Sequence, residues 1–157
     1  MKDETGMAAW RAFLTAHARV TELLEAELQR EHDLPLSWYD VLVQLSEAEG
    51  RKLRMTDLAG AVLLSKSGLT RLVDKMCAAG LVSRAADEAD RRGRWVSLTR
   101  AGQARLRAAA PVHLRGVAEH FTSHLSPERA ALLAETLTEI ANAAAGEAPA
   151  AVDSPGL

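Results

Sequence analysis

Several features are scarce or missing in this chain of 157 residues, and each absence narrows the possible classes of protein. The single cysteine, Cys77, excludes a disulfide within the chain, so we expect a reducing, cytoplasmic location. The longest apolar run, residues 58–64, is too short to span a bilayer. The acidic, polar start MKDETGM lacks the apolar segment of a signal peptide. Glycine-rich phosphate loops, nucleophile elbows and paired catalytic carboxylates are also missing, so we expect neither an enzyme nor a cofactor.

Aromatic residues are few, at 4%, but hydrophobic residues reach 48%, which is enough for one core. The net charge of −2 conceals an uneven distribution. Residues 51–107 hold 13 Lys/Arg and 5 Asp/Glu, a balance of +8, whereas the remainder holds 6 and 16, a balance of −10. A basic middle in an acidic frame focuses a polyanion on one part of a molecule. The alternative is an ordinary solvated face of arginines.

The central stretch of the chain begins with a short helix that has two different faces. Leu69, Leu72, Val73 and Met76 follow the helical spacing of a buried stripe. The opposite face carries small hydroxyls and basic heads, which suit base edges and phosphates: Lys66, Ser67, Thr70, Arg71 and Lys75. We expect Ser65 to cap the start of this helix and Gly80 to end it in a left-handed conformation.

Two short runs, residues 81–84 and 94–98, then predict an antiparallel hairpin, and residues 51–55 form an extended piece able to pair with it. The hairpin tip is basic and consists of Asp90, Arg91, Arg92, Gly93 and Arg94. A polar-faced helix followed by such a hairpin is typical of a winged helix-turn-helix. Many of the basic residues lie on these two elements, which favours nucleic-acid binding.

Longer helices flank this unit. We expect helices over residues 7–31, 37–50 and 56–62, then over 99–124 with a kink at Pro111, and from Ser126-Pro127-Glu128 to residue 144. Ser37 and Thr99 are the predicted caps of the second and fifth helices, with Asp40 completing a shortened capping box. Residues 145–157 have no periodicity and predict a disordered tail. The fold class is therefore mostly α (α+β), with the winged helix-turn-helix at about 37–99.

The first and last helices carry apolar stripes with more surface than one small winged helix covers. The stripes are Trp10, Phe13, Leu14, His17, Val20, Leu24 and Leu28 in the first helix, and Leu132, Leu133, Leu137 and Ile140 in the last. A two-fold dimer would bury them and would present two reading elements to two half-sites of DNA.

Over about residues 7–144 the chain resembles the MarR-type transcriptional regulators. The matching motifs are MTDLAGAVLLSKSGLTRLVDKMCAAGLVSR at 55–84 and DEADRRGRWVSLTRAG at 87–102. The resemblance implies a homodimer built from the terminal helices (about 7–31 and 100–144) and a palindromic operator, with the polar-faced helix in the major groove and the wing in the minor groove. It also implies that a ligand or an oxidant shifts the DNA-binding parts.

These considerations give a set of expected DNA contacts. Arg71 is the predicted base-edge contact, Ser67 and Thr70 are lighter neighbours, and Lys66 and Lys75 are phosphate contacts. Arg91, Arg92 and Arg94 suit the narrow minor groove, and Asp90 is expected to hold one arginine in a fixed pose or to be an ordinary turn residue. The complete predicted set is Ser65, Lys66, Ser67, Thr70, Arg71, Lys75, Arg91, Arg92 and Arg94.

A ligand pocket is expected where the first, second and fifth helices meet. Arg11, His17, Trp38 and Tyr39 offer a cation, an imidazole and aromatic walls, which suit a small aromatic acid or a phenol. The alternative is a solvated Arg11 with the others in the core or an interface.

Two further sensing ideas are weaker. Cys77 lies beside the buried stripe, where a thiol behaves as a small hydrophobe, so we expect no redox role for it. His120 and His124 are four apart on a predicted helix, but with Glu119 as the only carboxylate near in sequence we expect surface histidines and no metal.

Two rivals to a ligand-released DNA-binding repressor stay open. One is a winged-helix module that binds proteins and no DNA, which would usually lack the basic wing tip. The other is a DNA-binding regulator without any small-molecule effector.

Overall fold

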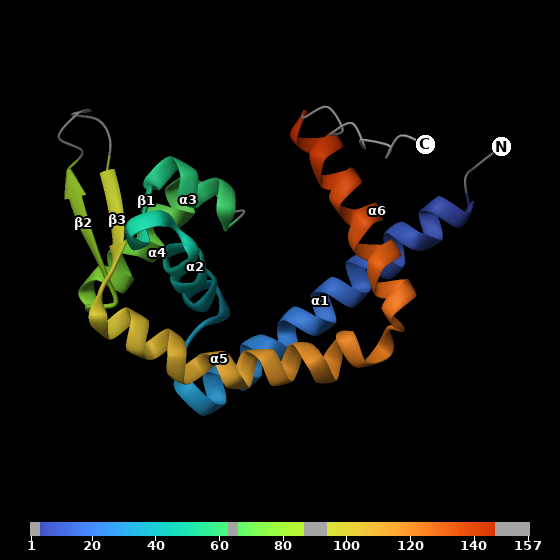
Figure 1. Ribbon diagram of the computed structural model, residues 1–157, viewed down its shortest axis with the longest axis horizontal. Coiled ribbons are helices and arrows are strands. Elements are labelled where there is room, and N and C mark those ends of the chain that lie inside the picture. The colour runs from blue at the N-terminus through green and yellow to red at the C-terminus, as the bar shows by residue number, and fades with distance from the viewer. Residues whose placement is uncertain (1–3, 63–65, 87–93, 147–157) are drawn as a thin grey trace, which may run out of the picture. The chain divides into compact units, whose positions relative to one another are not determined.

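The computed structural model describes residues 4–62, 66–86 and 94–146 (Figure 1). The elements in order are α1 (Glu4–His32), α2 (Leu36–Glu47), η1 (Glu49–Arg51), β1 (Lys52–Arg54), α3 (Met55–Ala61), α4 (Lys66–Ala78), β2 (Val82–Ala86), β3 (Arg94–Leu98), α5 (Arg100–His120), η2 (Thr122–His124) and α6 (Pro127–Ala145). The mostly α class with a small sheet is confirmed. None of the helices in these described ranges is both long and apolar enough to cross a membrane.

The three strands form one antiparallel sheet in the order β1-β3-β2. The predicted hairpin and the pairing of the extended piece before α3 are therefore confirmed. Val96 on the central strand pairs with Leu53 on one side and Arg84 on the other. Because side chains alternate along a strand, these three share the face on which Val96 is fully buried. Trp95 belongs to the opposite, outer face.

Helix α4 buries one face in the core, as its sequence spacing predicts. Leu69, Val73 and Met76 are fully buried in the cluster that also contains Leu42 and Leu58 of α2 and α3. The end of α4 is also as predicted, because Gly80 adopts φ +73°. Its N–H donates to the carbonyl of Cys77 at 2.9 Å, and the N–H of the next residue, Leu81, donates to Met76 at 3.0 Å. This pair of bonds is a Schellman motif.

The start of α5 packs directly on this helix end. The Thr99 hydroxyl lies 2.7 Å from the carbonyl oxygen of Gly80 and 2.9 Å from that of Leu81, and it accepts from the N–H of Gly102 at 2.9 Å. The predicted capping role of Thr99 is confirmed. A Cβ at Gly102 would overlap the carbonyl oxygen of Leu81, so only glycine fits this contact.

The predicted boundaries of α2 and α5 were wrong, and α2 ends at Glu47, before the 3-10 turn η1. Helix α2 begins at Leu36, with Pro35 in the cap position, so Ser37 does not cap it. Instead Glu25 of α1 accepts the N–H of Leu36 at 2.7 Å, which satisfies a free donor of the first turn from another helix. Helix α5 contains Pro111 but ends at His120, and a separate 3-10 turn, η2, holds His124.

The chain divides into two compact units, Met1–Val117 and Ala118–Leu157. The first contains the winged helix region, residues 36–98, together with α1 and most of α5. The second contains α6, which starts as predicted: Ser126 accepts the N–H of Arg129 at 3.3 Å and Pro127 occupies the first turn.

Candidate nucleic-acid interface

The exposed face of α4 is the polar face that the sequence predicts. The side chains of Ser67, Thr70, Arg71 and Lys75 are exposed, while the opposite face is buried. Lys66 begins the helix, but its side chain lies outside the described residues, as do Ser65, Asp90, Arg91 and Arg92. The structure therefore brings four predicted DNA contacts together on one helix. Hydroxyl donors beside guanidinium and ammonium groups suit base edges and phosphates.

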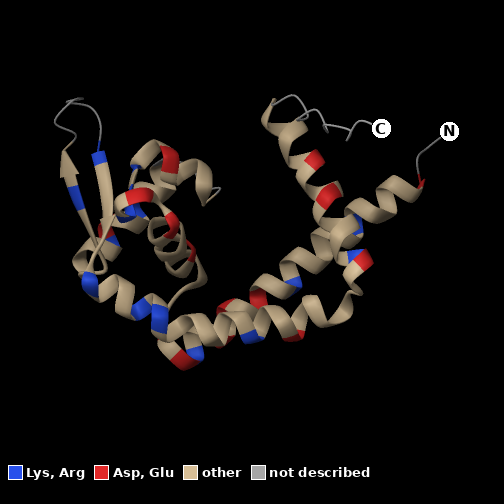
Figure 2. Ribbon diagram, in the orientation of Figure 1, with Lys and Arg blue, Asp and Glu red and all other residues tan. Residues whose placement is uncertain are grey.

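An open groove of about 530 Å³ adjoins this helix face. It is lined by residues of α3, α4 and both hairpin strands: Met55, Thr56, Thr70, Arg84 and Arg94. Arg94 is exposed, as expected of a wing residue. The groove thus joins Thr70 of α4 to two basic residues of the hairpin, and Figure 2 shows a blue basic position on each of β2 and β3.

Arg84 joins the hairpin to α4, a contact that the sequence did not predict. Its guanidinium forms an ion pair with Asp74, and it donates to the main-chain carbonyl of Thr70 at 3.1 Å. The side chain of Arg84 is 29% exposed and that of Asp74 is 58% exposed, so solvent weakens the ion pair. Only the strand register, which puts Arg84 on the inner face, could have revealed this partnership.

Two more basic residues surround Trp95 on the outer face of the sheet. The Lys52 ammonium nitrogen lies 5.0 Å from the ring centre, and the Arg54 guanidinium carbon lies 5.4 Å from it. These are cation–π distances. Neither cation was singled out from sequence, although alternating basic residues in the extended piece were a visible signal.

The four residues of the predicted ligand pocket are not brought together. His17 lines an open groove of about 610 Å³ with residues of α1, α2 and the end of α3, and Arg11 does not line it. Trp38 lines a different groove of about 840 Å³, beside Arg105. Tyr39 is buried and its ring packs 4.4 Å from that of His113.

The groove beside His17 is rich in carboxylates. Glu22, Glu25 and Asp40 line it. Burial raises the pKa of the Asp40 carboxyl, and the nearby negative charge of Glu25 raises it further. This electrostatic setting disfavours a bound carboxylate, which was one of the two ligand classes predicted.

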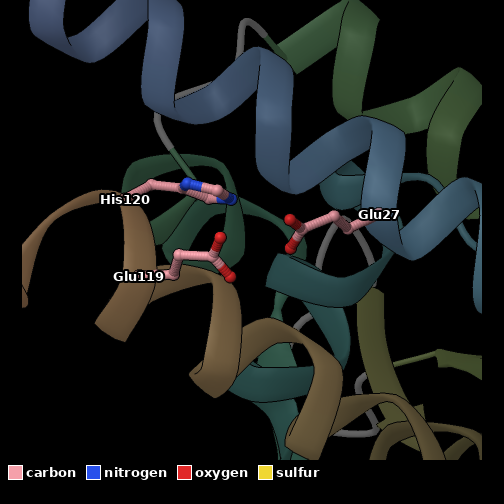
Figure 3. Close-up of side chains that lie close together, drawn as sticks. All are labelled: Glu27, Glu119 and His120. Atoms are coloured by element: carbon pink, nitrogen blue, oxygen red, sulfur yellow. The ribbon is translucent and has the colours of Figure 1, made fainter.

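The residues considered for sensing lie in separate places. Cys77 is free and partly buried against the core. Figure 3 labels Glu27 on α1, in the first unit, and Glu119 and His120 at the end of α5, in the second. Because α5 ends at His120, the helical i, i+4 spacing to His124 is lost. Within the described part of the second unit alone, no three His, Cys, Asp or Glu side chains gather as metal ligands.

Comparison with known proteins gives the same assignment from independent directions. The model of the MarR family matches residues 32–93. AbsC, a MarR family transcriptional regulator from Streptomyces coelicolor, has a sequence 39% identical to this chain. Its crystal structure superimposes with a TM-score of 0.86 and covers 94% of this chain and 99% of AbsC. Sco3205 from the same organism, a MarR family regulator solved in complex with DNA, is 30% identical, with 98% and 95% covered and a TM-score of 0.85.

A curated relative agrees. The transcriptional regulator HosA of Escherichia coli O111:H- is 32% identical over 114 residues, which is 72% of this chain and 84% of the relative. Regulators of this kind are not enzymes. The winged helix region, whose helix α4 exposes a basic, hydroxyl-bearing face, agrees with these relatives. The chain belongs to the MarR family of transcriptional regulators.

Proposed function

We propose that this regulator is a homodimeric repressor that reads a palindromic operator with α4 of each protomer. Arg71 contacts a base edge, Ser67 and Thr70 assist it, and Lys75 contacts phosphate. The observation that carries this proposal is the division of α4 into a fully buried apolar face and an exposed polar face. Sco3205, solved with DNA, supports a duplex as the partner.

The wing completes the contact in this proposal. Arg94, exposed on β3, and Arg91 and Arg92 at the tip enter the adjacent minor groove, whose negative potential attracts arginine. Asp90 holds one of these arginines in place. Ser65 and Lys66 contact phosphate near the start of α4 in this proposal, because a helix N-terminus attracts anions. Five of these residues, Ser65, Lys66, Asp90, Arg91 and Arg92, enter the proposal on the sequence alone.

The dimer part of the proposal rests on exposed apolar side chains. Trp10 is 52% exposed on α1, and Leu132 and Ile140 on α6 are 64% and 60% exposed. Large apolar side chains exposed in such numbers mark protein–protein surfaces. A second copy of the chain is the partner that gives two reading helices for two half-sites.

The ligand part of the proposal is narrowed by the groove beside His17. Its carboxylates repel an aromatic acid, whereas a phenol brings no negative charge and has a hydroxyl for His17 or Asp40. We therefore favour a neutral phenol over an aromatic acid as the releasing ligand. Such a ligand acts only through unequal affinity for the DNA-binding and released states.

The DNA proposal is tested with duplexes that the full-length protein selects from a random-sequence library. Arg71→Ala should cost about 1–3 kcal/mol of binding and relax the preference at one position of each half-site. Lys75→Ala should weaken all sequences alike and reduce the salt slope by about 0.9 for each lost phosphate contact. Arg19→Ala, which removes an exposed cation from α1, is the control.

The outcomes separate the rival functions. Failure of the parent protein to select any duplex would favour a winged-helix module that binds proteins instead. If the parent protein selects a duplex and both Arg71→Ala and Lys75→Ala bind it as the parent does, the DNA-reading surface is not on α4.

The ligand proposal is tested by calorimetry with phenol and benzoate, with and without selected duplex. We expect phenol to bind and duplex to weaken that binding by the same factor by which phenol weakens DNA binding. A regulator without an effector would bind neither compound in either condition.

A further inference from the structure

The outer face of the sheet carries basic and aromatic residues that take no part in the DNA contacts proposed for α4 and the hairpin tip. Arg54 pairs with Trp95 and Lys52 pairs with Ser97, so Lys52, Arg54 and Trp95 lie on one face. The register neighbours on that face are small and uncharged: Ser83 and Ala85 on β2, and Ser97 on β3. This face of the sheet thus presents one aromatic ring and two cations among small side chains.

The two cations converge on the same ring. Lys52 and Arg54 are two residues apart on β1, and their charged groups lie 5.0 and 5.4 Å from the centre of Trp95. Each cation is attracted by the negative face of the indole ring, while the two like charges on one strand repel each other. Two cationic heads beside one ring offer charged donors of the kind that bind phosphate oxygens.

This face adjoins the proposed DNA contact along the chain, on the other side of the same hairpin strand. Trp95 directly follows Arg94, whose side chain belongs to the opposite face of the same strand, and Arg54 directly precedes α3. A hairpin inserted into the minor groove has a sugar–phosphate strand on each side, because the groove is only about 6 Å wide. Arg84 and Arg94 belong to the inner face, and Lys52 and Arg54 belong to the outer one.

We propose that Lys52 and Arg54, aligned by Trp95, bind the phosphate backbone of duplex DNA on the side of the wing that faces away from α4. This inference rests on the proposed DNA-binding function and extends the contacted duplex beyond the half-site that α4 reads. The contacts are with phosphate, so they add affinity and salt dependence without sequence preference.

The experiment measures binding of the full-length protein to two versions of a selected duplex over a range of salt concentrations. One version ends at the wing contact, and the other extends one helical turn further on each side. On the longer duplex Lys52→Ala/Arg54→Ala should reduce the salt slope by about 1.8 for each bound protomer, which is about 0.9 for each lost phosphate. On the shorter duplex the variant should match the parent.

Three further variants sharpen the result. Arg54→Lys keeps the charge and should bind the longer duplex nearly as the parent does. Trp95→Leu should lose part of the length-dependent affinity, because the cations lose the ring that aligns them. Arg19→Ala, which removes an exposed cation from α1, should leave binding to both duplexes unchanged. Thermal unfolding of each variant verifies that the sheet is intact.

Other outcomes overturn the inference. An unchanged salt slope for the double variant on the longer duplex, or an equal loss on both duplexes, would show that this face touches no flanking phosphate. Loss of affinity with unchanged salt slope would show that the substitutions act indirectly on the DNA-binding surface and remove no phosphate contact. If the parent selects no duplex, the proposed function and this inference both fail.

Discussion

Helices α4 and α6 are similar in sequence pattern and different in environment. Each has apolar residues at helical spacing with polar residues between them. Helix α4 buries Leu69, Val73 and Met76 completely within its own chain, whereas α6 has no buried residue and leaves Leu132 64% exposed. The spacing of apolar residues therefore indicates that one face of a helix is suited to burial. It does not indicate whether the same chain or another molecule covers that face.

The difference has an energetic meaning. Burying a leucine side chain contributes about 1.5–3 kcal/mol, and α4 gains this on folding of a single chain. In the proposed dimer, helix α6 gains it from the partner copy, so its contribution there depends on protein concentration. The same substitution in the two helices should therefore give different kinds of effect.

The largest expected effect comes from comparing Leu69→Ala with Leu132→Ala. Leu69→Ala leaves a cavity in the core and should lower the free energy of unfolding by about 2–5 kcal/mol at every protein concentration. If the proposed dimer forms through α6, Leu132→Ala should instead raise the concentration at which that dimer dissociates. Calorimetric unfolding over a hundredfold range of concentration, with sedimentation, measures both. Equal concentration dependence in the two variants would contradict the comparison.

The next effect concerns two glycines within the first unit. Gly102→Ala forces a Cβ against the main chain of Leu81 and should cost about 1–3 kcal/mol of stability. Gly60→Ala is the matched control, because no atom lies within 4 Å of its added Cβ. Alanine has the higher helix propensity, so Gly60→Ala should stabilise α3 by about 0.5–1 kcal/mol. Chemical denaturation of both variants gives the sign of each change in the free energy of unfolding. Destabilisation by both substitutions would contradict the packing argument.

A smaller effect is expected where the hairpin meets α4. Asp74→Asn removes the charge that pairs with Arg84 and should cost less than about 1 kcal/mol, because both side chains are partly solvated. The loss should shrink further in 1 M salt. Glu135→Gln on α6, also an exposed helix carboxylate, is the control and should show neither effect. Salt-independent destabilisation by Asp74→Asn would mean that packing, and not charge, matters at this contact.

The smallest effect is a pH dependence from His113. Burial lowers the pKa of this imidazole, and its Nδ1 has no hydrogen-bond partner among the described residues. The unfolded state therefore binds the proton more tightly, so stability should fall as the pH drops below the ordinary histidine value of about 6.5. His113→Gln should flatten that fall between pH 7 and 5. His124→Gln, at an exposed position of the second unit, should leave it as in the parent.

The winged helix region was predictable because its signals are local. The stripe of α4, the left-handed Gly80, the Thr99 cap and the strand alternation each depend on residues close in sequence. The cap of α2 was not predictable in the same way. Glu25 serves it from eleven positions earlier, so a rule that looks for a hydroxyl beside the first turn chose Ser37 instead.

The candidate sites show the same limit. Arg84 with Asp74, and Lys52 and Arg54 around Trp95, follow from strand register, which composition alone does not give. Helix geometry alone already argues against the predicted ligand pocket. Trp38 and Tyr39 are consecutive on α2, and consecutive helix residues point about 100° apart, so they could not both line one wall. The structure accordingly buries Tyr39 against His113 and leaves Trp38 on another groove.

The bonds between Thr99 and the end of α4 also bear on the order of folding. They close a segment of about 20 residues, for which the entropic cost of bringing the ends together is modest. Contacts close in sequence form fast, so we expect the hairpin, the end of α4 and the start of α5 to assemble early and as a first-order process. Pairing of two chains in the proposed dimer then follows as a second-order step. A nascent chain emerging from the ribosome would hold a folded reading surface before any such pairing.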